Sequence, residues 1–368
     1  MIAYVCSFTE VGSALEKRLR AELPEIFWVS RKVAASSATS VSAAVCAPPD
    51  LVSAAEPTFS ARDFAEKAFK KHLPLVFIGA TGIAVRISAD FIKDKFFDSP
   101  VIVIDERGEF VIPLVSGHMG GANDLARMIA GRLGAVPVIT TASDVENKFA
   151  VDVFARRNGF SIVNREAVKH VTGKLLRGEK ACVWVHPSVA CPLDCTPAEL
   201  SLTQAATPPE NADIIVLPDE SSACCAARGE HCVVLVPKLY CVGMGCKKGK
   251  SFEELFAFLE ASVSAEIQRE IYAIASIDLK KDEIGLMELA QYLHVPFVTY
   301  AAAELAAVPG DFSESDFVRE QTGVSNVCER AAVLCAGEDG VLVCKKNAKD
   351  GMTVAVAKRK PRIITWET

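Results

Sequence analysis

Aromatic residues and long hydrophobic runs are both scarce in this sequence. Aromatic residues make up 7% of the chain although 50% of its 368 residues are hydrophobic, so aliphatic side chains must provide most of the core. This composition suits an α/β protein with buried parallel strands. The longest strongly apolar stretch, residues 75–85, contains two glycines and is far shorter than the roughly 18 residues of a membrane-spanning helix. No basic segment precedes the first apolar residues, so we expect a cytoplasmic protein without a membrane partner.

An excess of positive charge is also lacking. The formal net charge is −6, which argues against nucleic acid as a partner, because proteins that bind nucleic acids usually present a basic face. The densest basic segment, residues 358–362, is predicted to be a solvated tail.

Cysteines are frequent, but they lack the spacing of a zinc ribbon. The chain has 13 cysteines, and six of them fall between positions 182 and 232 together with two histidines. No C-x2-C pair is repeated at the distance that structural zinc sites require. We therefore expect reduced thiols and no protein-bound metal, with a metal site in this stretch as the alternative.

Strand and helix patterns alternate at both ends of the chain. In residues 1–145, apolar strand patterns alternate with helical ones, and residues 33–58 are predicted to form a loose connection. Residues 146–237 contain short strand patterns between loops rich in proline, serine and cysteine, and residues 238–368 resume the alternation. The sequence therefore predicts an α/β protein whose two α/β domains, 1–145 and 238–368, have parallel or mixed sheets and are joined by a smaller middle linker domain, 146–237.

A glycine-rich turn follows the predicted strand at residues 75–79. The segment GATGIAVR offers backbone amides at the start of a helix, together with the hydroxyl of Thr81 and the guanidinium of Arg86. It is neither a dinucleotide-binding fingerprint nor a P-loop, because no GK[ST] follows. The alternatives are an anion-binding turn and a tight strand–helix turn that needs glycine for packing.

The most informative segment is PLVSGHMGGANDLAR, residues 113–127. It places Ser116, His118, Gly120, Gly121 and Asn123 in one loop between a strand and a helix, where open α/β sheets bind ligands. His118 is the candidate general base or acid, Ser116 and the glycine amides can face a developing oxyanion, and Asn123 can bind substrate. The alternative for His118 is a structural histidine.

Paired acids, Asp105 and Glu106, precede this loop in the turn ERGE. We expect one of them to orient His118, with a polar hairpin turn as the alternative.

A second glycine-rich strand end, VGMGCKKGK, lies at residues 242–250. Gly243, Gly245, Lys247 and Lys248 suit a polycarboxylate ligand, and Cys246 is expected to have a lowered pKa beside lysines and a helix start.

Two further segments of the C-terminal part carry polar candidates. Asp278 and Lys280 follow a predicted strand, and Glu329 lies in the first turns of a predicted helix. All three are candidate substrate-binding residues, although Glu329 also suits the helix dipole alone.

Taken together, these strings resemble the CbiG family, the cobalt-precorrin-5A hydrolases of anaerobic cobalamin biosynthesis. The resemblance rests on GATGIAVR, the run IDERGEF through ITTASD, VGMGCKKGKSFEEL, ASIDLKKDEIGLMELA, GVSNVCERAAVL and TVAVAKRK, in the family's order. It covers about 75–145 and 238–358. GMGCKKG departs from the family, which tends to have a bulkier aliphatic residue and arginines there, and the geometry of anion binding is therefore in doubt.

The resemblance implies a carbon–carbon bond hydrolase that opens the ring-A δ-lactone of cobalt-precorrin-5A with water and releases acetaldehyde, giving cobalt-precorrin-5B. It implies no cofactor, since the substrate carries the cobalt, and other enzymes of the pathway as partners. Two alternatives remain: a non-catalytic module that binds or hands over cobalt-precorrins, and a nucleotide- or phosphate-binding enzyme.

Overall fold

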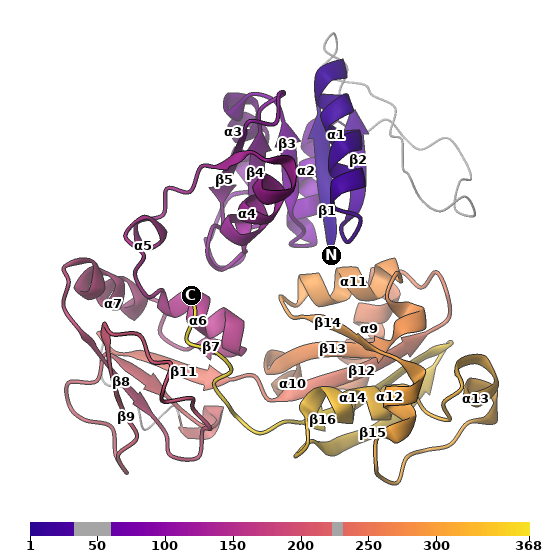
Figure 1. Cartoon of the computed structure of the whole chain (residues 1–368). Coiled ribbons are helices and arrows are strands. Elements are labelled where there is room, and N and C mark those ends of the chain that lie inside the picture. Colours follow the sequence, from indigo (N-terminus) through magenta and orange to yellow (C-terminus); the bar gives the residue numbers. More distant parts are fainter. Residues whose placement is uncertain (33–59, 223–230) are drawn as a thin grey trace. The chain divides into compact units, whose positions relative to one another are not determined.

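The computed structural model describes residues 1–32, 60–222 and 231–368, so the predicted loose connection at 33–58 lies outside the described residues. The chain divides into two compact units, Met1–Thr141 and Ala142–Thr368, and the described residues form three sheets (Figure 1). Parallel and antiparallel strands occur in all three, which confirms the predicted mixed α/β class. The division into three domains stays a prediction. No helix in the described segments is long and apolar enough to cross a membrane.

The first unit contains a six-stranded sheet with the order β2-β1-β3-β4-β5-β6. Strands β1 to β4 are parallel, whereas β5 runs antiparallel to β4. The strands are β1 (Ile2–Ser7), β2 (Phe27–Lys32), β3 (Leu75–Ile78), β4 (Val101–Ile104), β5 (Phe110–Val115) and β6 (Val136–Pro137). The helices are α1 (Glu10–Glu22), α2 (Ala61–Lys70), α3 (Thr81–Ser88) and α4 (Ala122–Leu133), with the 3-10 turn η2 (Ala89–Phe91).

The second sheet has the order β7-β11-β10-β8-β9. Strand β7 is antiparallel to β11, and the other neighbours are parallel. Its strands are β7 (Phe160–Ile162), β8 (Ala181–Val185), β9 (Leu200–Thr203), β10 (Ile214–Val216) and β11 (Val233–Pro237). The helices nearby in sequence are α5 (Ala142–Val145), α6 (Val151–Asn158) and α7 (Ala167–Leu176), with the turn η3 (Glu220–Ser222). Side chains from α6 and α7 share one core with this sheet.

The third sheet has the order β14-β13-β12-β16-β15. Strands β12, β13 and β14 are parallel, and β16 is antiparallel to both β12 and β15. The strands are β12 (Tyr240–Cys246), β13 (Ile271–Ile277), β14 (Phe297–Tyr300), β15 (Val341–Lys349) and β16 (Met352–Lys358). The helices are α9 (Phe252–Ser262), α10 (Ala265–Arg269), α11 (Ile284–Tyr292), α12 (Ala302–Ala307), α13 (Asp316–Thr322) and α14 (Cys328–Ala336), with the turn η4 (Asp278–Lys280).

Helices cover both faces of the third sheet. Successive side chains of a strand point to opposite sides of the sheet, so the contacts of β12 show which helices lie on each face. Val242 and Met244 of β12 share a core with α9 and α11. Cys241, which directly precedes Val242, packs against alanines of α14 on the other face. The sheet is thus the middle layer of three (Figure 1).

The C-terminal segment does not form the solvated tail that its basic residues predicted. Arg359 is 4% exposed, and Ile363 and Trp366 belong to the core of the second sheet. The Trp366 ring stacks on Phe154 at 5.0 Å between centroids, and its Nε1 donates to the carbonyl of Pro192 at 2.7 Å. The apolar residues that follow the basic ones, IITW, therefore decide where this segment lies.

Candidate active site

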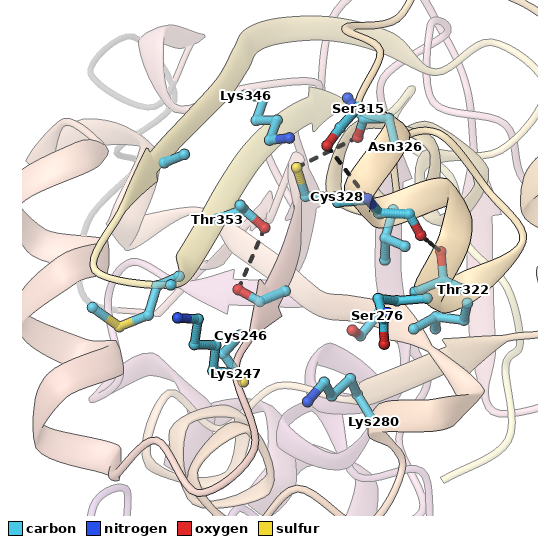
Figure 2. Close-up of a pocket in the computed structure, with 18 of the residues that line it drawn as sticks. Cys246, Lys247, Ser276, Lys280, Ser315, Thr322, Asn326, Cys328, Lys346 and Thr353 are labelled. Atoms are coloured by element: carbon cyan, nitrogen blue, oxygen red, sulfur yellow. Dashed lines mark hydrogen bonds between the residues drawn. The ribbon is translucent and has the colours of Figure 1, made fainter.

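A cavity of about 640 Å³ opens in the third sheet's part of the chain (Figure 2). It lies where the parallel strands β12 and β13 end, and the β15–β16 hairpin, α13 and the start of α14 complete its wall. Its volume is within the range of about 300–1,000 Å³ that is usual for small-molecule sites. The polar and sulfur-bearing side chains that line it include those of Cys246, Lys247, Ser276, Lys280, Ser315, Gln321, Thr322, Asn326, Cys328, Lys346, Lys349, Asp350 and Thr353.

The position of this cavity follows from the sheet topology. Ligands of open α/β sheets bind beyond the carboxyl ends of the parallel strands. Here Gly245 and Cys246 come from the end of β12, and Ser276 and Ile277 from the end of β13. Ser276 is buried, and its hydroxyl donates to the carbonyl of Met244 at 2.7 Å, so it ties the two strand ends together.

Two glycines of β12 permit close packing at this strand end. A Cβ at Gly243 would come within 1.8 Å of the Cys328 carbonyl oxygen, so this glycine lets α14 lie directly on the strand. A Cβ at Gly245 would approach the Thr353 hydroxyl to 2.8 Å. Gly243 was predicted to bind substrate, but it does not line the cavity, and its role here is packing.

Positive charge dominates the wall of the cavity. Four lysines line it, Lys247, Lys280, Lys346 and Lys349, against one carboxylate, Asp350. Lys280 donates to Glu283 at 3.3 Å. Within the described residues, no carboxylate forms an ion pair with Lys247, Lys346 or Lys349. Figure 2 shows Lys346 and Lys280 on opposite sides of the view. Such a wall suits a ligand with several carboxylates.

Apolar side chains share the wall with the lysines. Ile277, Leu279, Val318, Val327 and Met352 line the same cavity. Leu279 is 69% exposed, so it leaves apolar surface open at the cavity. The cavity can therefore receive a ligand with an apolar body and an acidic periphery.

Burial disfavours the thiolate form of the thiols in the cavity. Burial raises the pKa of Cys246 to about 11, and the lysines nearby do not offset it. The expected lowering of its pKa is wrong, because Cys246 ends a strand and the next helix, α9, begins only at Phe252. Burial likewise raises the pKa of Cys328 to about 11. Both thiols are protonated near neutral pH.

Glu329 supports the wall of the cavity from behind. It is fully buried, and it accepts hydrogen bonds from the amide and hydroxyl of Ser313, the side-chain amide of Asn326 and the amide of Lys346, at 2.7 to 2.9 Å. These bonds occupy its carboxylate, so the predicted direct contact with substrate is replaced by a structural role. Lys248 and Asp278, two other candidates, do not line the cavity.

The sequence did not predict that Asn326 and the lysines of the β15–β16 hairpin line the cavity. Asp350 and Gly351 have φ values of 51° and 77°, as in the two-residue hairpin turns that Asp-Gly favours. Gly351 also accepts the Lys247 amide at 2.8 Å, which brings the hairpin to the end of β12. The Asp-Gly pair could have predicted the hairpin from the sequence, but not that the hairpin lies next to β12 in the sheet.

The first unit separates the residues that were expected to act together. Because β5 runs antiparallel to β4, Asp105 and Glu106 lie at one end of these two strands and the 116–121 loop lies at the other end. At about 3.3 Å per residue, the strands place these groups on the order of 15 Å apart. The expectation that Asp105 or Glu106 orients His118 is therefore wrong.

Both acids have partners of their own, Asp105 within the turn and Glu106 at the start of α1. The Asp105 carboxylate accepts the amides of Arg107, Glu109 and Phe110 at 2.6 to 3.0 Å. Glu106 accepts the hydroxyl of Thr9 at 2.7 Å. The polar hairpin turn, which was the alternative, describes the Asp105 side chain.

The loop around His118 is held by its own backbone. Ser116 has φ 58°, and its hydroxyl donates to the carbonyl of Asp98 at 2.7 Å. The Gly121 amide donates to the His118 carbonyl at 3.1 Å, so it is not free for an oxyanion. Asn123 is 3% exposed and donates to Thr141 at 3.0 Å, and a Cβ at Gly120 would meet Ser116 at 2.5 Å. His118 itself is half-buried.

Thr81 and Arg86 belong to α3, at the end of the strands opposite to the 116–121 loop. Thr81 begins the helix after β3 and is half-buried, and Arg86 lies exposed in its last turn. Their binding of substrate stays a prediction.

The central cysteines are only partly described. Cys224 and Cys225 lie outside the described residues. Across residues 1–32, 60–222 and 231–368, no three metal-binding side chains gather in a way that could hold a metal ion.

Comparisons with known proteins identify the family to which the chain belongs. The family description "Cobalamin synthesis G N-terminal" matches residues 63–144, and "Cobalamin synthesis G C-terminus" matches residues 240–357. The chain is 34% identical to the cobalt-precorrin-5A hydrolase of Salmonella typhimurium, over 96% of this chain and 97% of that one. It is 35% identical to the cobalt-precorrin-5A hydrolase of Priestia megaterium, over 81% and 82%.

A solved structure is also similar over nearly the whole length. The cobalamin biosynthesis protein G homolog from Sulfolobus solfataricus is 21% identical, with a TM-score of 0.40, covering 98% of this chain and 97% of that one. The two family matches and the full-length curated relative are decisive: this chain belongs to the cobalamin synthesis G family, CbiG.

Proposed function

We propose that this protein is a cobalt-precorrin-5A hydrolase. The observation that carries the proposal is the 34% identity to a curated enzyme of that name over 96% of this chain and 97% of the relative. Agreement over both whole chains supports a shared reaction better than agreement over one domain. The proposal includes a cytoplasmic location and other enzymes of the pathway as neighbours.

The proposed reaction has two stages. Water first adds to the carbonyl of the ring-A δ-lactone, and the ring oxygen leaves as an alcohol after it has taken a proton. The hydroxyl proton is then removed, and its oxygen forms the C=O of acetaldehyde as the carbon–carbon bond to the macrocycle breaks. The electron pair of that bond passes to the macrocycle, which takes up a proton and becomes cobalt-precorrin-5B. The substrate carries its own cobalt, so no cofactor is proposed.

The cavity of the third sheet is the proposed seat of the macrocycle. Its apolar wall can cover one face of the ring, and Lys247, Lys280 and Lys346 can bind peripheral carboxylates. None of its titratable side chains is a histidine. We keep His118, a residue of the first unit, as the proposed general base or acid on its chemistry alone, since an imidazole suits proton transfer near neutral pH.

Labelled water tests the lactone-opening stage. Cobalt-precorrin-5A is incubated anaerobically with the purified protein in water enriched in heavy oxygen, and the product mass is measured. We expect one heavy oxygen in the ring-A carboxylate, because water attacks the carbonyl carbon. Product without the label would overturn the hydrolytic route.

A variant tests the proposed role of His118 separately. His118→Ala is expected to lower kcat about a hundredfold or more while KM changes little, as for loss of a general acid or base. Product formation at the wild-type rate would overturn that role but not the reaction. Circular dichroism compares the folding of the two proteins.

A further inference from the structure

Two thiols meet on the face of the third sheet that is opposite to α9 and α11. Cys241 comes from β12 and is fully buried, and Cys335 comes from the last turn of α14 and is half-buried. Both belong to one small cluster with alanines of α14 and β16, and both are free thiols. A small oxidant can therefore reach Cys335, while Cys241 lies behind it.

A buried cation without an acidic partner lies beside this pair. Arg359 is 4% exposed, and its guanidinium carbon lies 3.7 Å from the centroid of the Tyr272 ring. Its Nη2 has no hydrogen-bond partner in the described part of the chain, and no described carboxylate forms an ion pair with it. Arginine stays protonated in proteins, so a buried guanidinium requires a counter-charge nearby.

Cys335 can provide that counter-charge as a thiolate. Hydrogen bonds from the Cys241 thiol and the Tyr300 hydroxyl, helped by the charge of Arg359, hold the pKa of Cys335 below its ordinary value although burial opposes them. The same contact with Cys335 raises the pKa of Cys241, and burial raises that of Tyr300. These contacts favour a negative charge on Cys335 over one on Cys241 or Tyr300.

We propose that Cys335 and Cys241 form a reversible redox pair, in which a hydroperoxide oxidises Cys335 and Cys241 resolves the product to a disulfide. The Cys335 sulfur attacks one peroxide oxygen, the O–O bond breaks, and a sulfenic acid forms with release of hydroxide or an alkoxide. The Cys241 sulfur then attacks the sulfenic sulfur, and the S–O bond breaks with loss of water. The two thiols lose two electrons, which the peroxide gains.

Such a disulfide would join two walls of the cavity. Strand β12 carries Gly245 and Cys246 into it, and α14 carries Cys328. Because α14 already rests on Gly243, closing a sulfur–sulfur bond of about 2.05 Å would pull its last turn toward the strand.

Peptide mapping of the full chain tests the redox pair. Trypsin releases Cys241 together with Cys246, in residues 239–247, and Cys335 together with Cys344, in residues 331–345. The test therefore uses the background Cys246→Ser, Cys344→Ser, in which each peptide keeps one thiol. The protein is purified anaerobically, treated with equimolar hydrogen peroxide, alkylated and digested without reductant.

We expect a linked 239–247/331–345 peptide that dithiothreitol abolishes and that neither Cys241→Ser nor Cys335→Ser forms. Tyr300→Phe, which removes only a hydroxyl, and Arg359→Met should each slow alkylation of Cys335 at pH 7, because each removes a group that lowers the pKa of this thiol. Two unlinked, alkylated peptides after peroxide treatment would overturn the proposal, as would Cys335 over-oxidised without the link. The readout is covalent, so it is independent of the proposed hydrolase activity.

Discussion

The Glu329 carboxylate accepts the backbone amide of Lys346 at 2.7 Å, although the two residues belong to different elements, α14 and β15. The same carboxylate holds Ser313, which precedes α13, and Asn326, which precedes α14. One buried acid thus fixes three segments that border the cavity. Its position explains how lysines of a hairpin can face the ends of β12 and β13.

Replacing this acid by its amide is the first test. In Glu329→Gln one carboxylate oxygen becomes an NH2 group. This group faces hydrogen-bond donors and cannot accept from them, so two of the four hydrogen bonds are lost. We expect a loss of roughly 2 to 4 kcal/mol in the free energy of unfolding, measured in denaturant. Glu338→Gln changes an exposed acid in the same way and should leave the free energy unchanged within about 0.5 kcal/mol. Equal stability of the two variants would contradict the role of Glu329.

Lys346 and Lys345 form a matched pair for substrate binding. They are neighbours on β15, but only Lys346 lines the cavity, because adjacent strand residues point to opposite faces. Lys346→Ala should raise KM for cobalt-precorrin-5A about tenfold, the effect of one lost charged hydrogen bond, with little change in kcat. Lys345→Ala should leave both constants as they are. If both variants raise KM equally, the effect is one of overall charge and the assignment of Lys346 fails.

The first part of this site could be predicted because it depends on one strand and its turn. The string VGMGCKKGK indicates a strand that ends in glycines, and Gly245, Cys246, Lys247 and Lys280 do line the cavity. Lys346 could not be found in this way. Its place depends on β16 pairing antiparallel with β12 across more than a hundred residues, which no local pattern specifies.

The opposite error occurred in the first unit. Asp105 and Ser116 lie on either side of β5 in the sequence, and their closeness along the chain suggested that they are neighbours in space. The turn ERGE reverses the chain, so the 116–121 loop lies at the end of the sheet where β4 begins. The direction of β5 was readable from the short turn, because parallel strands need a crossover of about a dozen residues or more.

Cys246 offers a prediction about pH. Because burial raises its pKa to about 11, roughly a thousandth of this thiol is ionised at pH 8, and the fraction grows tenfold per pH unit up to that value. Alkylation by iodoacetamide, followed by mass spectrometry, should therefore accelerate steeply between pH 8 and 10. A rate that levels off below pH 10 would show an ordinary or lowered pKa.

The protonated state of Cys246 also leads to a prediction about kcat. Cys246→Ser keeps the size and the hydrogen-bonding capacity of the residue, and a protonated thiol makes no covalent intermediate. Its kcat should remain within about threefold of the wild-type value. A loss of a thousandfold or more would reveal a nucleophile and contradict this account.

Trp366 anchors the C-terminal segment to the second sheet's core. Trp366→Ala removes the stacking on Phe154 and the hydrogen bond to Pro192, which should cost about 3 to 5 kcal/mol and lower the midpoint of thermal unfolding by several degrees. Ile364→Ala is the control, since Ile364 is 47% exposed two residues earlier. Equal midpoints for the two variants would show that the segment is a free tail after all.

Acetaldehyde is the product that tests the proposed activity most directly. Purified protein and enzymatically prepared cobalt-precorrin-5A are mixed without oxygen, volatile aldehyde is trapped, and the remaining macrocycle is weighed by mass spectrometry. The account predicts one acetaldehyde for each cobalt-precorrin-5A consumed, and none from substrate alone or from heat-denatured protein. Binding of the substrate without any release of acetaldehyde would contradict it and would leave a protein that only holds or hands over cobalt-precorrins.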